Sequence, residues 1–215
     1  SVIYGLFQDS EDNIWFCTNS GAVKFNGNKL VSYKKKDGLT GNEVFKIFED
    51  SQHRLWFMTA NGRISYYFNK KIYNEKDHPI FSQLNINSFI SDIREDDQHN
   101  IWIVPNTGNI YILSESLKSF SLQPSKLLNS IFCSYKGAKY LPSMQGIYSL
   151  QTKSIAMQSV FFKPGGYTTR HCQADELIYS GGYNKLLVYN LRNASIDAHD
   201  MPELAPAINS IVVID

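Results

Sequence analysis

Five charged or titratable side chains are the best candidates for binding a ligand. Lys46, Asp92 and Arg94 lie in segments that are otherwise largely apolar, and Arg170 and His171 lie in a similar later segment. A set of cations with one carboxylate could hold a polar ligand through charge-assisted hydrogen bonds. Charges near a protein core usually compensate one another, so mutual pairing is the preferred interpretation.

Acidic clusters suggest a second chemistry. The segments DSEDN (residues 9–13) and DDQHN (residues 96–100) are rich in oxygens that could hold calcium. A calcium loop needs six or more converging oxygens, usually with a bidentate glutamate further on, and no glutamate stands in that register. We therefore predict that Asp9, Asp50 and Asp96 accept backbone hydrogen bonds within tight turns.

Nucleophile and metal motifs are missing from the sequence. His53 and His99 occupy the same position, three residues before a tryptophan, and are expected to be surface imidazoles in separate units. Neither G-x-S-x-G nor a phosphate-binding loop is present. Cys17, Cys133 and Cys172 lack metal spacing and are expected to be buried apolar residues. No metal or cofactor is predicted.

The positions that recur most regularly belong to a repeat of about forty residues. Its clear copies read DSEDNIWFCTNSG, DSQHRLWFMTANG and DDQHNIWIVPNTG. The shared positions are Asp9, Trp15 and Gly21, then Asp50, Trp56 and Gly62, then Asp96, Trp102 and Gly108. Two weaker copies carry Tyr140 and Tyr179 at the tryptophan position, and INSIVVID at residues 208–215 matches the opening of a sixth copy.

Each copy divides into four short runs rich in β-branched and aromatic residues. In the second copy these are EVFKIFED, RLWFMTA, GRISYYF and KKIYN, separated by SQH, NG and NK. Glycine and asparagine suit tight hairpins, and runs that are apolar on both faces suit sheets packed between other sheets. The sequence thus predicts an all-β fold, a β-propeller of four-stranded antiparallel blades. As one domain over 1–215, it has blades at about 1–41, 42–86, 87–127, 128–166 and 167–207, with a further strand at 208–215.

The inner strands are predicted to share one register. One position reads Gly5, Lys46, Asp92, Cys133, Cys172 and Val213, and the next but one reads Phe7, Phe48, Arg94 and Tyr135. On this alignment the charged residues line the central channel or its mouth. Longer loops, where functional residues often lie, are expected at 74–87 and 193–207. Aromatic residues at 66–68 and 73 could stack on sugar rings, although packing between blades is preferred.

Composition excludes some classes of partner. The chain has 215 residues, of which 13% are aromatic and 19% charged, with a net charge of +1. This charge gives no reason to expect binding to nucleic acid or to an acidic membrane. No apolar run reaches membrane-spanning length and no signal-peptide pattern stands at Ser1. Because both termini fall within predicted inner strands, the sequence is expected to be an excised piece.

The repeat resembles that of the two-component regulator propeller family. The resemblance rests on VFKIFEDSQHRLWFMTANGRISYY and on the preceding DGLTGNEV, and it covers residues 1–111 best. It implies a propeller of about seven blades in the periplasmic part of an inner-membrane histidine kinase. The five blades and one strand found here would then be part of a larger ring.

The resemblance implies a non-catalytic sensor in a two-component system that controls transcription. The expected ligand is a small molecule or an oligosaccharide, and a second propeller or a homodimer is a further possible partner. One alternative is a propeller lyase or glycosidase with its active site at the channel mouth. Another is a scaffold that binds only proteins, and the fold by itself does not separate the three.

Overall fold

The computed structural model describes residues 2–123, 132–143, 146–150, 157–161, 168–182, 185–193 and 195–201. Its contacts divide the chain into two compact units, Ser1–Ser125 and Lys126–Asp215, and each is described by itself. The predicted strand at 208–215 lies outside the described residues. The extent of the propeller as one domain with the blade limits given above stays a prediction.

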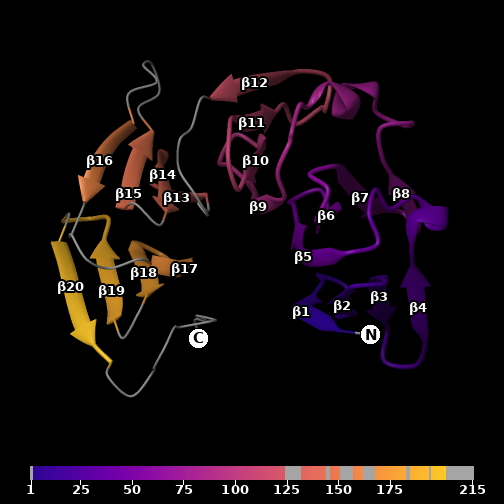
Figure 1. Cartoon of the computed structure of the whole chain (residues 1–215), viewed down its shortest axis with the longest axis horizontal. Coiled ribbons are helices and arrows are strands. Elements are labelled where there is room, and N and C mark those ends of the chain that lie inside the picture. The colour runs from indigo at the N-terminus through magenta and orange to yellow at the C-terminus, as the bar shows by residue number, and fades with distance from the viewer. Residues whose placement is uncertain are drawn as a thin grey trace. The chain divides into compact units, whose positions relative to one another are not determined.

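The first unit contains three four-stranded antiparallel sheets, called blades 1 to 3 (Figure 1). Blade 1 consists of β1 (Ile3–Gln8), β2 (Ile14–Thr18), β3 (Gly21–Phe25) and β4 (Leu30–Tyr33). Blade 2 consists of β5 (Val44–Glu49), β6 (Leu55–Thr59), β7 (Ile64–Phe68) and β8 (Lys71–Tyr73). Blade 3 consists of β9 (Ile90–Glu95), β10 (Ile101–Pro105), β11 (Ile110–Leu113) and β12 (Phe120–Gln123).

The second unit contains two more four-stranded antiparallel sheets, blades 4 and 5. Blade 4 consists of β13 (Cys133–Tyr135), β14 (Ala138–Ser143), β15 (Gly146–Leu150) and β16 (Met157–Phe161). Blade 5 consists of β17 (Thr168–Ala174), β18 (Leu177–Gly182), β19 (Lys185–Asn190) and β20 (Ser195–Asp200). The prediction of four-stranded antiparallel blades is therefore confirmed, but the loop predicted at 193–207 is wrong where β20 forms a strand.

Helix is almost absent from the described part of the chain. It is limited to two short 3-10 turns, η1 (Lys35–Asp37) and η2 (Pro79–Gln83), both in segments that connect one blade to the next. Within these residues, no helix is long and apolar enough to cross a membrane.

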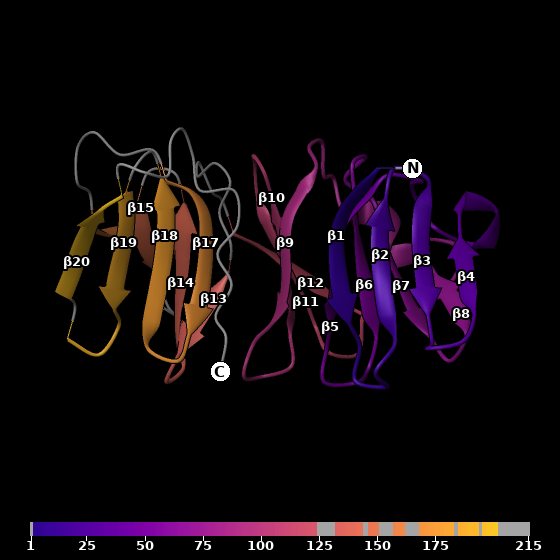
Figure 2. The same cartoon turned by 90° about the horizontal axis from the view of Figure 1, so that it is seen from below.

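The tryptophans occupy matching places in the first unit. Trp15, Trp56 and Trp102 lie on β2, β6 and β10, the second strand of each blade, and are at most 4% exposed. One core cluster holds Trp15 with residues of blades 1 and 2, and another holds Trp56 with residues of blades 2 and 3. The first strands β1 and β5 pack beside each other (Figure 2). All five residues of β6 and of β10 are buried, as expected for strands with sheets on both sides.

The turns between the first two strands explain the residue types that recur there. Asp12, His53 and His99 take positive φ angles of 64°, 61° and 61° at equivalent places. Aspartate, asparagine and histidine tolerate this left-handed region better than most other residues. The two histidines thus occupy a position that the turn geometry selects.

Candidate functional site

The repeated aspartates are hydrogen-bonded inside their own turns. Asp9 accepts the backbone N–H of Asn13 through Oδ1 at 2.8 Å, and its Oδ2 accepts the indole Nε1–H of Trp15 at 2.7 Å. The indole bonds recur in the next two blades, from Trp56 to Asp50 at 2.7 Å and from Trp102 to Asp96 at 2.8 Å. The predicted backbone bonds are confirmed, and the bond to tryptophan explains the fixed spacing of six residues.

The carboxylate of Asp9 is held in its ionised form. Burial by itself raises its pKa, but the hydrogen bonds from Trp15 and Asn13 outweigh that effect and leave the pKa below its usual value. In blade 2 the corresponding Asp50 also binds the side chain of Arg54, whose Nε lies 2.5 Å from Oδ2. Because N–H donors converge on these carboxylates, their oxygens are used as hydrogen-bond acceptors that stabilise the turns.

A second set of contacts links the turn of one blade to the turn of the next. Ser10 of blade 1 donates its backbone N–H to Oε2 of Glu49 at 2.8 Å and its hydroxyl to Oε1 at 2.5 Å. Nδ1 of His53 lies 2.9 Å from the same hydroxyl and 3.1 Å from Oε1. This serine–glutamate–histidine clasp therefore joins blades 1 and 2.

The same clasp joins blades 2 and 3. Ser51 donates its N–H and its hydroxyl to Glu95 at 2.7 and 2.6 Å, and Nδ1 of His99 lies 3.0 Å from both Ser51 Oγ and Glu95 Oε1. The hydrogen bond to Glu95 raises the pKa of His99. Burial raises the pKa of Glu95, but the bonds from Ser51 and His99 lower it further than burial raises it. The clasp is thus strongest when the glutamate is ionised and the histidine is protonated. Both His53 and His99 are exposed, as predicted.

The predicted channel residues of the first unit lie together and pair with one another. Nζ of Lys46 lies 2.9 Å from Oδ1 of Asp92, and Nη2 of Arg94 lies 3.5 Å from the same oxygen. The carboxylate of Asp92 is completely buried, whereas the side chains of Lys46 and Arg94 are 43% and 32% exposed. The guanidinium of Arg94 also lies 5.3 Å from the ring centroid of Phe48. The preferred interpretation, mutual pairing, is confirmed for these three residues, and a role in ligand binding stays a prediction.

The other two predicted ligand residues belong to the second unit. Arg170 and His171 are part of β17, where they pair with Gly181 and Ser180 of β18. Their side chains lie outside the described residues. Their predicted part in a ligand site stays a prediction.

The predicted inner-strand register is wrong for blades 4 and 5. Cys133 pairs with Tyr140 and Cys172 with Tyr179, whereas the tryptophans of blades 1 to 3 pair with Phe7, Phe48 and Arg94. The two cysteines therefore share the register of Phe7 and not that of Lys46. The cause is the first turn, which has five residues in blade 1 but two in blades 4 and 5. Both cysteines are free thiols, and burial raises the pKa of Cys172.

The long connection between blades 2 and 3, predicted at 74–87, forms the walls of two cavities. It contains η2, whose Phe81 is 6% exposed and packs in the core beside Trp56. The connection then runs closely over Gly62, which has a φ of +71°. A Cβ at Gly62 would lie 2.5 Å from the carbonyl oxygen of Ser88. Glycine is therefore required at this turn for the connection to take its path.

The first cavity, here called the polar cleft, has a volume of about 390 Å³. It lies between the turn at Asn61–Arg63 and the connection, and its lining includes Glu75, Asn85 and Asn87. Nη1 of Arg63 and Oε1 of Glu75 are 3.3 Å apart in an exposed ion pair. Phe81 also contributes to the lining. Amides, a guanidinium, a carboxylate and an aromatic ring together suit a small polar ligand with several hydroxyl or amide groups.

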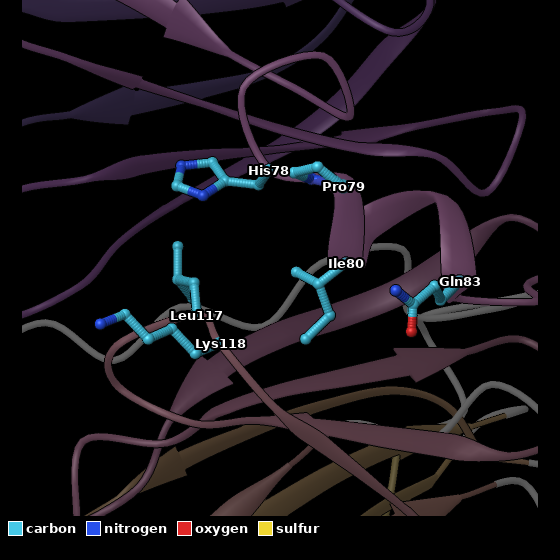
Figure 3. Close-up of a pocket in the computed structure, with 6 residues that line it drawn as sticks. All are labelled: His78, Pro79, Ile80, Gln83, Leu117 and Lys118. Atoms are coloured by element: carbon cyan, nitrogen blue, oxygen red, sulfur yellow. The ribbon is translucent and has the colours of Figure 1, made fainter.

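The second cavity, here called the η2 pocket, has a volume of about 350 Å³ and shares no lining residue with the polar cleft (Figure 3). Its lining consists of His78, Pro79, Ile80, Gln83, Leu117 and Lys118. The first four belong to the connection, and the last two belong to the segment between β11 and β12.

The aromatic hairpin of blade 2 is used for packing, as preferred from the sequence. Tyr66 and Tyr67 are 5% and 9% exposed and belong to the two core clusters. The rings of Tyr66 and Tyr73 stack with centroids 5.1 Å apart. The hydroxyl of Tyr66 lies 2.7 Å from Nε2 of His78 and ties the hairpin to the connection.

Sequence reasoning missed the clasps, the polar cleft and the η2 pocket. A signal for the clasps was present, because glutamate directly precedes the repeated aspartate at Glu49 and Glu95, and serine directly follows it at Ser10 and Ser51. The cavities had only a weak signal, the length of the connection between blades 2 and 3.

Two segments of the chain, residues 1–20 and 38–61, match the family model described as "Two component regulator propeller". A comparison with curated proteins gave no match.

Solved structures show the same fold at low sequence identity. The chain is similar to the extracellular domain of a hybrid two-component system from B. thetaiotaomicron, with a TM-score of 0.72 and 18% identity over 91% of this chain and 29% of that one. The extracellular domain of a one-component system from B. thetaiotaomicron has a TM-score of 0.74 and 17% identity, and the match covers 98% of this chain and 32% of that one. Virginiamycin B lyase from Staphylococcus aureus has a TM-score of 0.68 and 16% identity, and the match covers 91% of this chain and 68% of that one. The fold is a β-propeller, and the chain spans about a third of the length of the first two structures.

Proposed function

We propose that this chain is the extracytoplasmic sensing part of a membrane-anchored two-component protein. The proposal starts from the two segments that match the two-component regulator propeller model. In this proposal the propeller has no catalytic activity of its own. It binds a small molecule or an oligosaccharide, and binding changes the activity of a histidine kinase that controls transcription. The similarity to two extracellular domains from B. thetaiotaomicron supports the location and the signalling role.

The polar cleft is the observation that carries the ligand-binding part of the proposal. Its volume of about 390 Å³ lies within the range of small-molecule sites. Asn85 and Asn87 are exposed residues that line the cleft, and a side-chain amide can both donate and accept hydrogen bonds. Lys46 and Arg94, beside Asp92, are a second proposed place for the ligand, since both cations are partly exposed.

Signalling requires that the ligand favour one of two arrangements of the parent protein. A ligand shifts such an equilibrium only by the difference in its affinity for the two states. The connection between blades 2 and 3 suits this purpose because it contacts the core through Phe81 and also lines the cleft. A second propeller, in a homodimer or in the same chain, is the proposed partner in this change.

The direct test of ligand binding is a thermal-shift screen of neutral and acidic oligosaccharides and small metabolites. Any hit is then measured by calorimetry on the original chain and on the Arg63→Ala and Asn87→Ala variants. We expect at least one ligand whose affinity falls about tenfold in each variant, as for loss of a hydrogen bond to a charged or polar partner. A hit that binds all three proteins equally would exclude the cleft.

The role in signalling has a separate test. The coding sequence of the parent protein is expected to include a membrane-spanning segment and a histidine kinase domain. A parent protein without either would refute the two-component part of the proposal.

The lyase or glycosidase alternative makes a different prediction. It expects stoichiometric Mg, Ca or Zn in the purified protein, or cleavage of the bound ligand. The similarity to virginiamycin B lyase concerns the fold alone and gives the alternative no residue-level support.

A further inference from the structure

The η2 pocket combines hydrogen-bond donors with an apolar wall. Its volume of about 350 Å³ is near the lower end of the usual range for ligand sites, so it suits a small molecule. Three polar side chains, those of His78, Gln83 and Lys118, contribute to its lining. Figure 3 shows His78 on one side, with Leu117 opposite it.

His78 presents one nitrogen of a neutral imidazole ring to the pocket. Burial lowers the pKa of His78 and raises the pKa of Tyr66 to about 12, so both groups are neutral at pH 7. The hydroxyl of Tyr66 lies 2.7 Å from Nε2, and the tautomer of His78 determines which of the two groups donates. When the hydroxyl donates, the ring proton of the neutral imidazole is on Nδ1. The ring nitrogen nearer the side-chain stem faces Leu117 across the cavity (Figure 3).

Lys118 gives the pocket its charge. No carboxylate contributes to the lining. The nearest acids in sequence have other partners, because Asp77 binds Nζ of Lys71 at 2.5 Å and Glu115 accepts the amide of Gln52 at 3.0 Å. Figure 3 shows the amide of Gln83 on the far side of Ile80 from His78 and Lys118. The part of the pocket next to Lys118 is therefore positive, which favours a carboxylate.

The rest of the pocket is apolar. Pro79, Ile80 and Leu117 supply this wall. Leu117 is 5% exposed and has a φ of +55°, a conformation that a bulky residue rarely adopts. A conformation of this kind persists where the surrounding packing holds it, and Leu117 belongs to the same core cluster as Trp56.

We propose that the η2 pocket binds a small organic anion that has one carboxylate and an apolar body. The carboxylate is bound by Lys118, with Nδ1–H of His78 as a second donor. The apolar body lies against Ile80 and Leu117. This site is separate from the polar cleft, and its occupation does not depend on the signalling role proposed above.

The test uses three probes with the isotope-labelled chain in NMR titrations at pH 7. Hexanoate carries both features, hexanamide lacks the charge, and acetate lacks the apolar body. We expect hexanoate to bind with a dissociation constant on the order of 1 mM and to shift the amide signals of residues 80–83 and 117–118. Hexanamide and acetate should each bind about tenfold more weakly.

Two lysine variants provide the matched comparison. Lys118→Gln keeps a polar side chain but removes its charge, and it should weaken hexanoate binding about tenfold. Lys76→Gln removes an exposed lysine of the connection between blades 2 and 3 that does not line the pocket, and it should leave binding unchanged. Lys118 is exposed, so its replacement should not disturb folding. No saturable shift with hexanoate, equal binding of hexanamide, or equal loss in the two variants would overturn the proposal.

Discussion

Replacing Asp50 by alanine should destabilise the first unit far more than replacing Asp9 by alanine. Both carboxylates accept an indole N–H and backbone N–H groups. Asp50 alone also pairs with an arginine, Arg54, whose side chain is only 7% exposed and whose Nη2 has no hydrogen-bond partner. Removing Asp50 therefore leaves a buried cation without its carboxylate as well as unpaired neutral donors.

The magnitude follows from these contacts. Breaking a buried ion pair by removing one partner costs about 3–5 kcal/mol. Leaving neutral donors unsatisfied, as Asp9→Ala does, costs about 1–3 kcal/mol. All three tryptophans lie in the first unit, so urea unfolding followed by tryptophan fluorescence reports on that unit.

The sequence of the neighbouring blades supplies the control. Asn13 and Asn100 stand where blade 2 has Arg54, so Arg54→Asn converts the turn to the type found in blades 1 and 3. In that background, Asp50→Ala should cost no more than Asp9→Ala does in the original chain. If the loss on removing Asp50 is the same with and without the arginine, the buried ion pair does not explain the effect.

Two further predictions concern the turns. Gly62→Ala should destabilise the chain more than Gly108→Ala, because a Cβ at Gly62 would lie 2.5 Å from the carbonyl oxygen of Ser88 and one at Gly108 has open space around it; equal unfolding midpoints in urea would contradict this. In NMR titrations His99 should have a pKa above 6.5, and Glu95→Gln should bring it back towards that value. Since the pKa of His99 is raised and that of Glu95 is lowered, the clasp should stabilise the fold most between pH 4.5 and 6.5. The contribution of the clasp to stability should fall as the pH rises through the folded pKa of His99, and also as the pH drops through the folded pKa of Glu95. An unchanged pKa of His99 in the Glu95→Gln variant would refute this account.

The sequence predicts the blades well because the repeat carries their physical requirements. Trp15, Trp56 and Trp102 recur with turn residues at fixed distances, and each fills an equivalent buried place. The same regularity fails in blades 4 and 5, where the register was aligned by analogy. A turn shortened from five residues to two moves Cys133 and Cys172 into the register of Phe7.

The candidate site was harder to predict because tertiary contacts determine it. Lys46, Asp92 and Arg94 were identified as charges near the core, and their pairing follows from the need to compensate them. The polar cleft depends on the path of a connection whose residues show no periodic pattern. Only its close passage over Gly62 brings Asn87 to the same cavity as Arg63.

The most direct test of the sensing role is a map of the ligand's footprint by hydrogen exchange. The ligand identified in the thermal-shift screen is added to the chain, and amide protection is compared with and without it. Binding in the polar cleft predicts added protection at residues 61–63 and 82–87. Protection confined to the strands that carry Lys46 and Asp92, or no protection anywhere, would contradict a sensor built on the connection between blades 2 and 3.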